Sequence, residues 1–218
     1  MKKSRFLYLD PRVNPGKVAS LEALQTQYAA YLGVCVQAML AVHRFSIALK
    51  DKQAFFPACS ELSSQIVKNV RDHAISIVSG WASSKYTTKL RSVIKGKFND
   101  GEIDETLRSA LYILGKRLVD KPGGKVTQEA LDLYWSWLLD EEVVGRTPGI
   151  SSRCGMRMSE MTAVLSMSTD TKLSAWWLGF SHLSAGKARI QLPLAASPYV
   201  KDVTDVSKGV LARKTKQG

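Results

Sequence analysis

The chain has 218 residues, which is enough for one large or two small domains with a sizeable core. Apolar residues make up 45% and charged residues 23% of the chain, a balance that excludes a disordered protein. The net charge of +12 favours a polyanionic partner, and nucleic acid is the commonest one for a soluble protein.

The composition also narrows the compartment and the kinds of site. No apolar run is long enough to span a bilayer, and the N-terminal one is too short for a signal peptide. We therefore expect a cytoplasmic protein with no membrane partner. Cys35, Cys59 and Cys154 are widely separated and form no C-x-x-C pair, which argues against a disulfide framework and a zinc site.

The first 50 residues predict a short strand followed by a long helix. Residues 5–9 alternate weakly, and the Asn14-Pro15-Gly16 sequence then provides a turn, an N-cap and a proline at the first helical position. Apolar residues recur at helical spacing from there to about Lys50. Residues 16–50 are therefore predicted to form one amphipathic helix.

A second amphipathic helix is predicted from Ser60 to Trp81, with Ser60 as its N-cap. Lys68 and Arg71 lie on its polar side. The stretch that follows, from Lys85 to Phe98, carries five positive charges and no negative one. Basic residues interleaved with aromatic ones are typical of surfaces that follow a phosphate backbone and stack on bases. A solvated linker is the alternative interpretation of the same charge run.

Two helices are then predicted, at residues 103–118 and 127–138, the second capped by Thr127. Residues 101–145 hold nine acidic and five basic side chains, so this helical pair is expected to be a structural lobe. From residue 146 the pattern changes to strands, at residues 161–167, 173–183 and 187–194. Pro193 should end the last strand or place it at an edge. Lys187 and Arg189 share one face of that strand, and residues 146–218 carry eleven basic and four acidic groups.

No set of residues with the spacing of an active site is present. The acidic clusters lie at helix ends and in loops, and the three histidines have no metal-ligand spacing. No phosphate-binding glycine motif and no G-x-S-x-G occurs. We therefore expect no metal site, no cofactor and no enzymatic activity in this chain. An enzyme with dispersed metal-binding carboxylates is kept as a third hypothesis, behind a nucleic-acid-binding module and a helical scaffold.

The residues from Pro57 to Trp81 also resemble a known family. A proline and a serine are followed by S-x-x-(V/I)-x-x-x-(V/I)-R-D-x-A and a closing tryptophan, which resembles the N-terminal half of TnpB proteins and type V CRISPR effectors. An inserted helical lobe follows, and then G-K-x-x-I-x-L-P-L at residues 186–194 with Tyr199-Val-Lys201. The last pattern is similar to a wedge-domain strand of that family.

The resemblance implies an α+β fold, in which a helical recognition lobe at 16–145 is inserted into a small barrel-like wedge (oligonucleotide-binding) domain. Residues 1–15 would supply its first strand and residues 146–218 its basic, β-rich remainder, apparently incomplete at the C-terminus. The implied partners are guide RNA, target double-stranded DNA and the rest of an effector with a RuvC-like domain, whose carboxylates would lie beyond residue 218. The chain would then bind without cutting, as part of antiviral defence.

The candidate contact residues combine the cations and the aromatic side chains of both basic segments. Trp81, Tyr86 and Tyr199 are the candidates for base stacking. The cations expected to contact phosphates are Lys68, Arg71, Lys85, Lys89, Arg91, Lys95, Lys97, Arg153, Arg157, Lys187, Arg189 and Lys201. The alternative is a helical scaffold that docks a protein partner, with its basic charge incidental.

Overall fold

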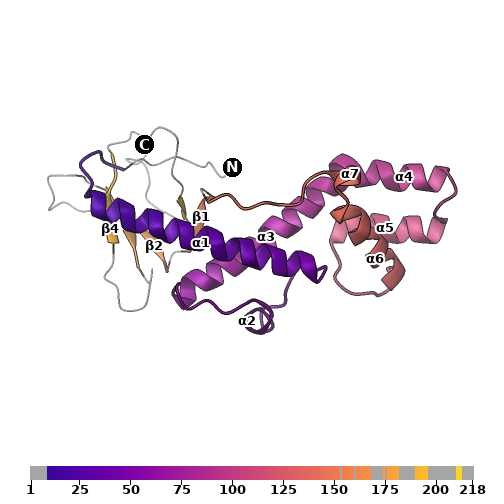
Figure 1. Ribbon diagram of the computed structural model, residues 1–218, viewed down its shortest axis with the longest axis horizontal. Helices are drawn as coiled ribbons and strands as arrows, with labels where there is room; N and C mark the ends of the chain where they lie inside the picture. The colour runs from indigo at the N-terminus through magenta and orange to yellow at the C-terminus, as the bar shows by residue number, and fades with distance from the viewer. Residues whose placement is uncertain are drawn as a thin grey trace. The chain divides into compact units, whose positions relative to one another are not determined.

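The computed structural model describes residues 9–152, 154–159, 161–167, 174, 176–181, 190–195 and 210–212. It has an α+β fold in which the helices precede the strands along the chain (Figure 1). Its contacts divide the chain into two compact units. We call residues 1–31, 59–70 and 151–218 the mixed unit, and residues 32–58 and 71–150 the helical unit.

This division differs from the expected domains. Residues 16–31 and 59–70, which were expected in the helical lobe, group with the β-rich segment instead. The boundaries at residues 31 and 70 fall inside two long helices, α1 (Pro15–Ala41) and α3 (Ser64–Lys85). A long helix shows no change of composition where it leaves one core and enters another, so the sequence gives no signal there.

The predicted helix from residue 16 to Lys50 is wrong at its end, because α1 stops at Ala41. His43 adopts a left-handed backbone with φ of 56°. Its amide donates to the carbonyl of Leu40 at 3.2 Å, and the next amide, of Arg44, donates to the carbonyl of Met39 at 3.0 Å. These two bonds make a Schellman motif, in which glycine is the usual residue at the position of His43. The short helix α2 (Lys52–Phe55) follows.

The next helix begins later and continues further than predicted. Residue 64, not Ser60, opens α3, and Trp81 does not end it. The chain passes from α3 through a five-residue π-helical turn, η1 (Tyr86–Leu90), directly into α4 (Arg91–Asn99). The basic stretch is therefore a helix and not a linker.

The π-helical turn follows from the spacing of the buried side chains. In the helical unit these residues recur every four positions: Ala74, Val78, Ala82, Tyr86, Leu90 and Ile94. In an α-helix of 3.6 residues per turn, each such step drifts by about 40° around the axis. One wider π-helical turn takes up an extra residue and brings the apolar stripe back towards the core.

The next two helices are confirmed, with small changes at their ends. Helix α5 (Glu105–Arg117) is capped by the carboxylate of Asp104, which accepts from the amide of Leu107 at 2.7 Å. Helix α6 (Gln128–Leu139) is capped by Thr127, whose hydroxyl accepts from the amide of Ala130 at 3.1 Å. A short helix, α7 (Glu141–Val144), follows. Helix α5 packs against both α4 and α6, and α7 packs against η1 and α6.

The mixed unit contains two small antiparallel sheets. Strands β2 (Ala163–Met167), β3 (Trp176–Phe180) and β4 (Ile190–Pro193) form an open three-stranded sheet in the order β2-β3-β4. Strands β1 (Met156–Met158) and β5 (Val210–Ala212) pair separately. Pro193 is the last residue of edge strand β4, as expected, and its carbonyl accepts from the amide of Asp10 at 2.9 Å.

Two interactions attach the start of the chain and α3 to these strands. Leu9 forms an antiparallel bridge with Leu194, at the position where a first strand was expected. The buried side chain of Asn69 donates to the hydroxyl of buried Thr162 at 3.2 Å. In the described part of the chain, no helix has the length and apolarity needed to cross a bilayer.

Candidate nucleic-acid interface

Three basic side chains are exposed on the continuous helix that η1 and α4 form. Lys89, Arg91 and Lys95 are exposed, while Leu90 and Ile94 between them are fully buried. Arg91 and Lys95 are four residues apart and so are neighbours on the helix surface. Lys89 lies two residues before Arg91 and therefore on another side of the helix, beyond the buried Leu90. We call Arg91 and Lys95 the α4 basic face.

The positive charge of this face is not neutralised within the described residues. No ion pair is found there for Arg91, for Lys95 or for the neighbouring Lys89, although other cations of the helical unit form them. Around the face, Thr87 and Thr88 use their hydroxyls as donors to helix carbonyls one turn earlier, at 2.8–2.9 Å. Those hydroxyl oxygens keep lone pairs but add no negative charge. An anion placed here would relieve repulsion between like charges one helical turn apart.

Two of the predicted lysines hold the fold together instead. The ammonium of Lys85 is half-buried and donates to the carbonyl of Val144, the last residue of α7. Lys97 pairs with Glu102 across the turn between α4 and α5, at 2.6 Å. Both charges are thus engaged in contacts that join elements of the helical unit, and they are less available to phosphates than the α4 basic face.

Tyr86, which was expected to stack on bases, is a buried residue in this structure. Its side chain is 6% exposed, and its ring lies against the backbone of Gly115 in α5. Burial raises the pKa of Tyr86, an effect that the nearby charge of Arg91 partly opposes. Trp81 is half-buried, and its indole nitrogen is buried without a hydrogen-bond partner in the described structure. The two aromatic side chains near the basic helix are therefore largely part of the core and not of an exposed surface.

The remaining described candidates are spread over other elements. Arg71 of α3 is half-buried, donates to the carbonyl of Pro57 at 3.4 Å and lies over the ring of Phe56 at 5.9 Å. Lys68 of α3 and Arg157 of β1 are exposed residues of the mixed unit. Sequence spacing predicted Lys68 and Arg71 on one helix, but the division into units separates them.

The other five candidates, Arg153, Lys187, Arg189, Tyr199 and Lys201, lie outside the described residues. Their neighbours in β4 do alternate as the sequence predicts, with Gln191 exposed and Leu192 buried. The predicted basic face of this strand stays a prediction.

The structure also brings together residues that sequence reasoning did not select. The rings of His43 and Phe45 lie nearly parallel to that of Trp135 in α6, with centroid distances of 5.2 and 4.3 Å. The loop after α5 carries Asp120, whose carboxylate accepts hydrogen bonds from the amides of Phe45 and Ser46. The sequence does contain a signal for a basic surface here, because residues 116–125 hold four basic groups and one acidic group inside a lobe that is acidic overall.

Neither a metal-binding cluster among the described residues nor a similar known protein helps to identify the function of this chain. Among the residues that the structure describes, no three His, Cys, Asp or Glu side chains lie close enough together to hold a metal ion. The chain matches no protein-family model, no curated protein and no solved structure.

Proposed function

We propose that this chain binds nucleic acid through the phosphate backbone, with the α4 basic face as a principal contact. The observation that supports this proposal most directly is the presence of two exposed, unneutralised cations, Arg91 and Lys95, one turn apart on α4. The net charge of +12 supplies a long-range attraction for a polyanion. Contacts of this kind position a nucleic acid without reading its sequence.

The test is a binding titration with a labelled 20-nucleotide RNA and the matching DNA duplex, at several salt concentrations. For B-DNA, each phosphate neutralised contributes about 0.9 to the slope of log K against log [salt]. Replacing both cations of the α4 basic face by glutamate should weaken binding at least tenfold and lower the slope by about 2. A matched control is Lys50→Glu, an exposed lysine of the same unit that lies outside this face.

Single substitutions allow two variants with the same change of net charge to be compared. Lys95→Glu and Lys50→Glu change the net charge equally, so a general charge effect should weaken binding equally in both. We expect Lys95→Glu alone to weaken binding severalfold. Equal affinities of the two variants, or a slope near zero for the unmodified chain, would disprove the proposed contact.

In its more specific form, the proposal is that the chain is the recognition half of an RNA-guided DNA-targeting protein. It would grip guide RNA and target double-stranded DNA, and its strands would belong to a wedge domain of the barrel type. Support comes from the resemblance of residues 57–81 and 186–194 and from the order of helices before strands. In such systems base pairing supplies sequence specificity, and the protein supplies charge and shape.

This specific form has its own experiment. The protein is expressed with its native locus, and the RNA that copurifies with it is extracted and sequenced. One dominant structured RNA is expected, whereas a mixture that mirrors the cellular RNA pool would contradict a guide. The purified chain should bind the guide and its target but leave the DNA uncut in Mg²⁺ or Mn²⁺, because the proposal assigns it no catalytic residue.

A second candidate function is that of a helical scaffold that docks a partner protein. Helix α1 favours it, because Val34 is 49% exposed on that helix and Val42, just after its end, is 52% exposed. Retention of one defined partner protein after nuclease treatment would support this candidate. Loss of that partner with the nucleic acid would favour the first.

A further inference from the structure

We propose that His43 stacks on an unpaired nucleobase and that the basic residues from the end of α5 through the following loop, residues 116–125, bind the adjoining phosphates. This inference rests on the proposed nucleic-acid binding and adds a second contact, one for single strands. It concerns the helical unit alone, to which all of these residues belong.

The first observation is the aromatic support beneath His43. Its imidazole lies at 12° to the plane of Trp135, with 5.2 Å between the ring centroids, and the side chain is nevertheless exposed. Trp135 itself is 1% exposed and packs on Phe45 as well, so it belongs to the core. One face of the imidazole is supported by Trp135, and the exposure of the residue leaves part of its surface accessible to a second flat ring.

The second observation is the backbone at this position. His43 holds a φ of 56° in a Schellman motif, where glycine would cost the chain less. A residue other than glycine is uncommon in this conformation, and residues held in sparsely populated backbone conformations cluster at functional sites. The contact with Trp135 explains why the ring is held in this position, but it does not explain why the ring is exposed to solvent.

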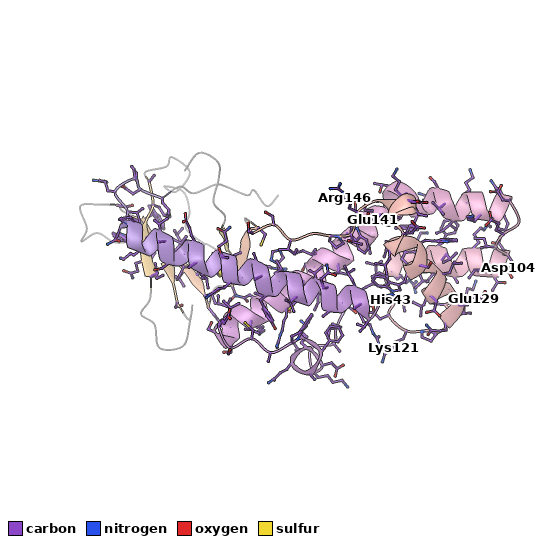
Figure 2. The ribbon with its side chains drawn as sticks, viewed as in Figure 1. His43, Asp104, Lys121, Glu129, Glu141 and Arg146 are labelled. Atoms are coloured by element: carbon purple, nitrogen blue, oxygen red, sulfur yellow. The ribbon has the colours of Figure 1, made fainter. Side chains whose placement is uncertain are left out.

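The third observation is the fixed position of the basic loop beside this ring. Asp120 accepts hydrogen bonds from the amides of Phe45 and Ser46, and its own carbonyl accepts from Arg44 at 3.1 Å. The segment after His43 and the loop before Lys121 are thereby joined. Figure 2 labels His43 and Lys121 with their side chains.

The end of α5 and the loop after it present cations that form no ion pair. These exposed residues, none of which is paired with an acidic side chain within the described structure, are Lys116 and Arg117 of α5 and Lys121 and Lys125 of the loop. A tight turn, in which Gly123 and Val126 exchange two backbone hydrogen bonds of 2.8 and 3.1 Å, orders the end of the loop. A supported aromatic ring beside several cations is the combination by which proteins bind single strands without reading their sequence.

The experiment uses the full chain and a labelled 20-nucleotide single-stranded RNA, with a duplex of the same sequence as the second ligand. His43→Gly removes the ring, yet it suits the left-handed backbone, so the variant should melt at or above the temperature of the unmodified chain. His43→Gln covers Trp135 with a side chain that has no aromatic ring. His43→Phe restores a ring.

The expected result is a selective loss of single-strand affinity. Removing one base-stacking side chain should weaken single-strand binding about 5- to 10-fold in both His43→Gly and His43→Gln. His43→Phe should stay within about twofold of the unmodified chain, and duplex binding should change less than twofold in all three. Lys121→Gln with Lys125→Gln should weaken single-strand binding and lower its salt slope by about 1 to 2.

Each contrary outcome has a distinct meaning. If His43→Gly and His43→Gln bind the single strand as the unmodified chain does, His43 is only part of a helix end and the inference is overturned. If single-strand and duplex binding fall equally, the stacking role is likewise overturned. If the unmodified chain binds neither ligand, the proposed function fails too, and the inference fails with it.

Discussion

Replacing Gly115 by alanine tests the packing that presents the α4 basic face. Gly115 lies in α5, where a Cβ atom would stand 2.0 Å from Cδ2 and 2.2 Å from Cε2 of Tyr86. Carbon atoms in contact are normally about 3.5 Å or more apart, so the ring would have to move by about 1.5 Å. Tyr86 is the first residue of η1 and is 6% exposed, so the ring has no open space to enter.

The expected loss of stability follows from two opposing effects. Overpacking a well-packed core costs about 1 to 3 kcal/mol, and the depth of this overlap places it at the upper end. Alanine in place of glycine inside a helix raises the free energy of unfolding by about 1 kcal/mol. The net loss in the free energy of unfolding should therefore be about 2 kcal/mol.

The assay is chemical denaturation, with the midpoint and the slope fitted separately. Gly96→Ala is the matched control, because Gly96 lies inside α4 and a Cβ there would meet nothing within 4 Å. That variant should gain about 0.5 to 1 kcal/mol. If Gly115→Ala is as stable as Gly96→Ala, the close packing of Tyr86 on α5 is refuted. In a Tyr86→Leu background, Gly115→Ala should lose most of its cost.

Three further substitutions test the parts that surround the two proposed contacts. Asp120→Ala removes a carboxylate that accepts three hydrogen bonds from residues 45–46, and should cost about 1 to 3 kcal/mol of unfolding free energy in a denaturant titration. Thr127→Ala removes the cap of α6 and should cost about 1 kcal/mol; an unchanged midpoint would contradict the cap. Hydrogen bonds from Arg12 lower the pKa of Asp10 to about 2, so its stabilising effect is present above pH 4 and is lost as the pH falls towards 2. Asp10→Asn should accordingly melt below the unmodified chain at pH 6 and approach it near pH 2, and a constant difference would contradict this linkage.

The sequence by itself determined those helices and strands whose ends are marked by a residue with a local effect, such as a capping side chain or a proline. Asp104 and Thr127 cap α5 and α6 because a side-chain oxygen next to an amphipathic run satisfies a free amide wherever the helix lies. The strand at 161–167 followed from alternation, and Pro193 at an edge followed from its missing amide. The α+β class follows from these same patterns.

Only the tertiary structure decided where α1 ends, how the basic helix is oriented, and which aromatic residues are internal. The Schellman turn at His43 ends α1, and the ring of His43 packs on Trp135, about ninety residues further along the chain, a contact that no local pattern encodes. Gly115 of α5 leaves room for the ring of Tyr86, the first residue of the π-helical turn, and so buries an aromatic side chain that composition alone assigned to a binding surface. Sequence patterns report what one segment prefers, whereas burial and charge exposure depend on which distant segment packs against it.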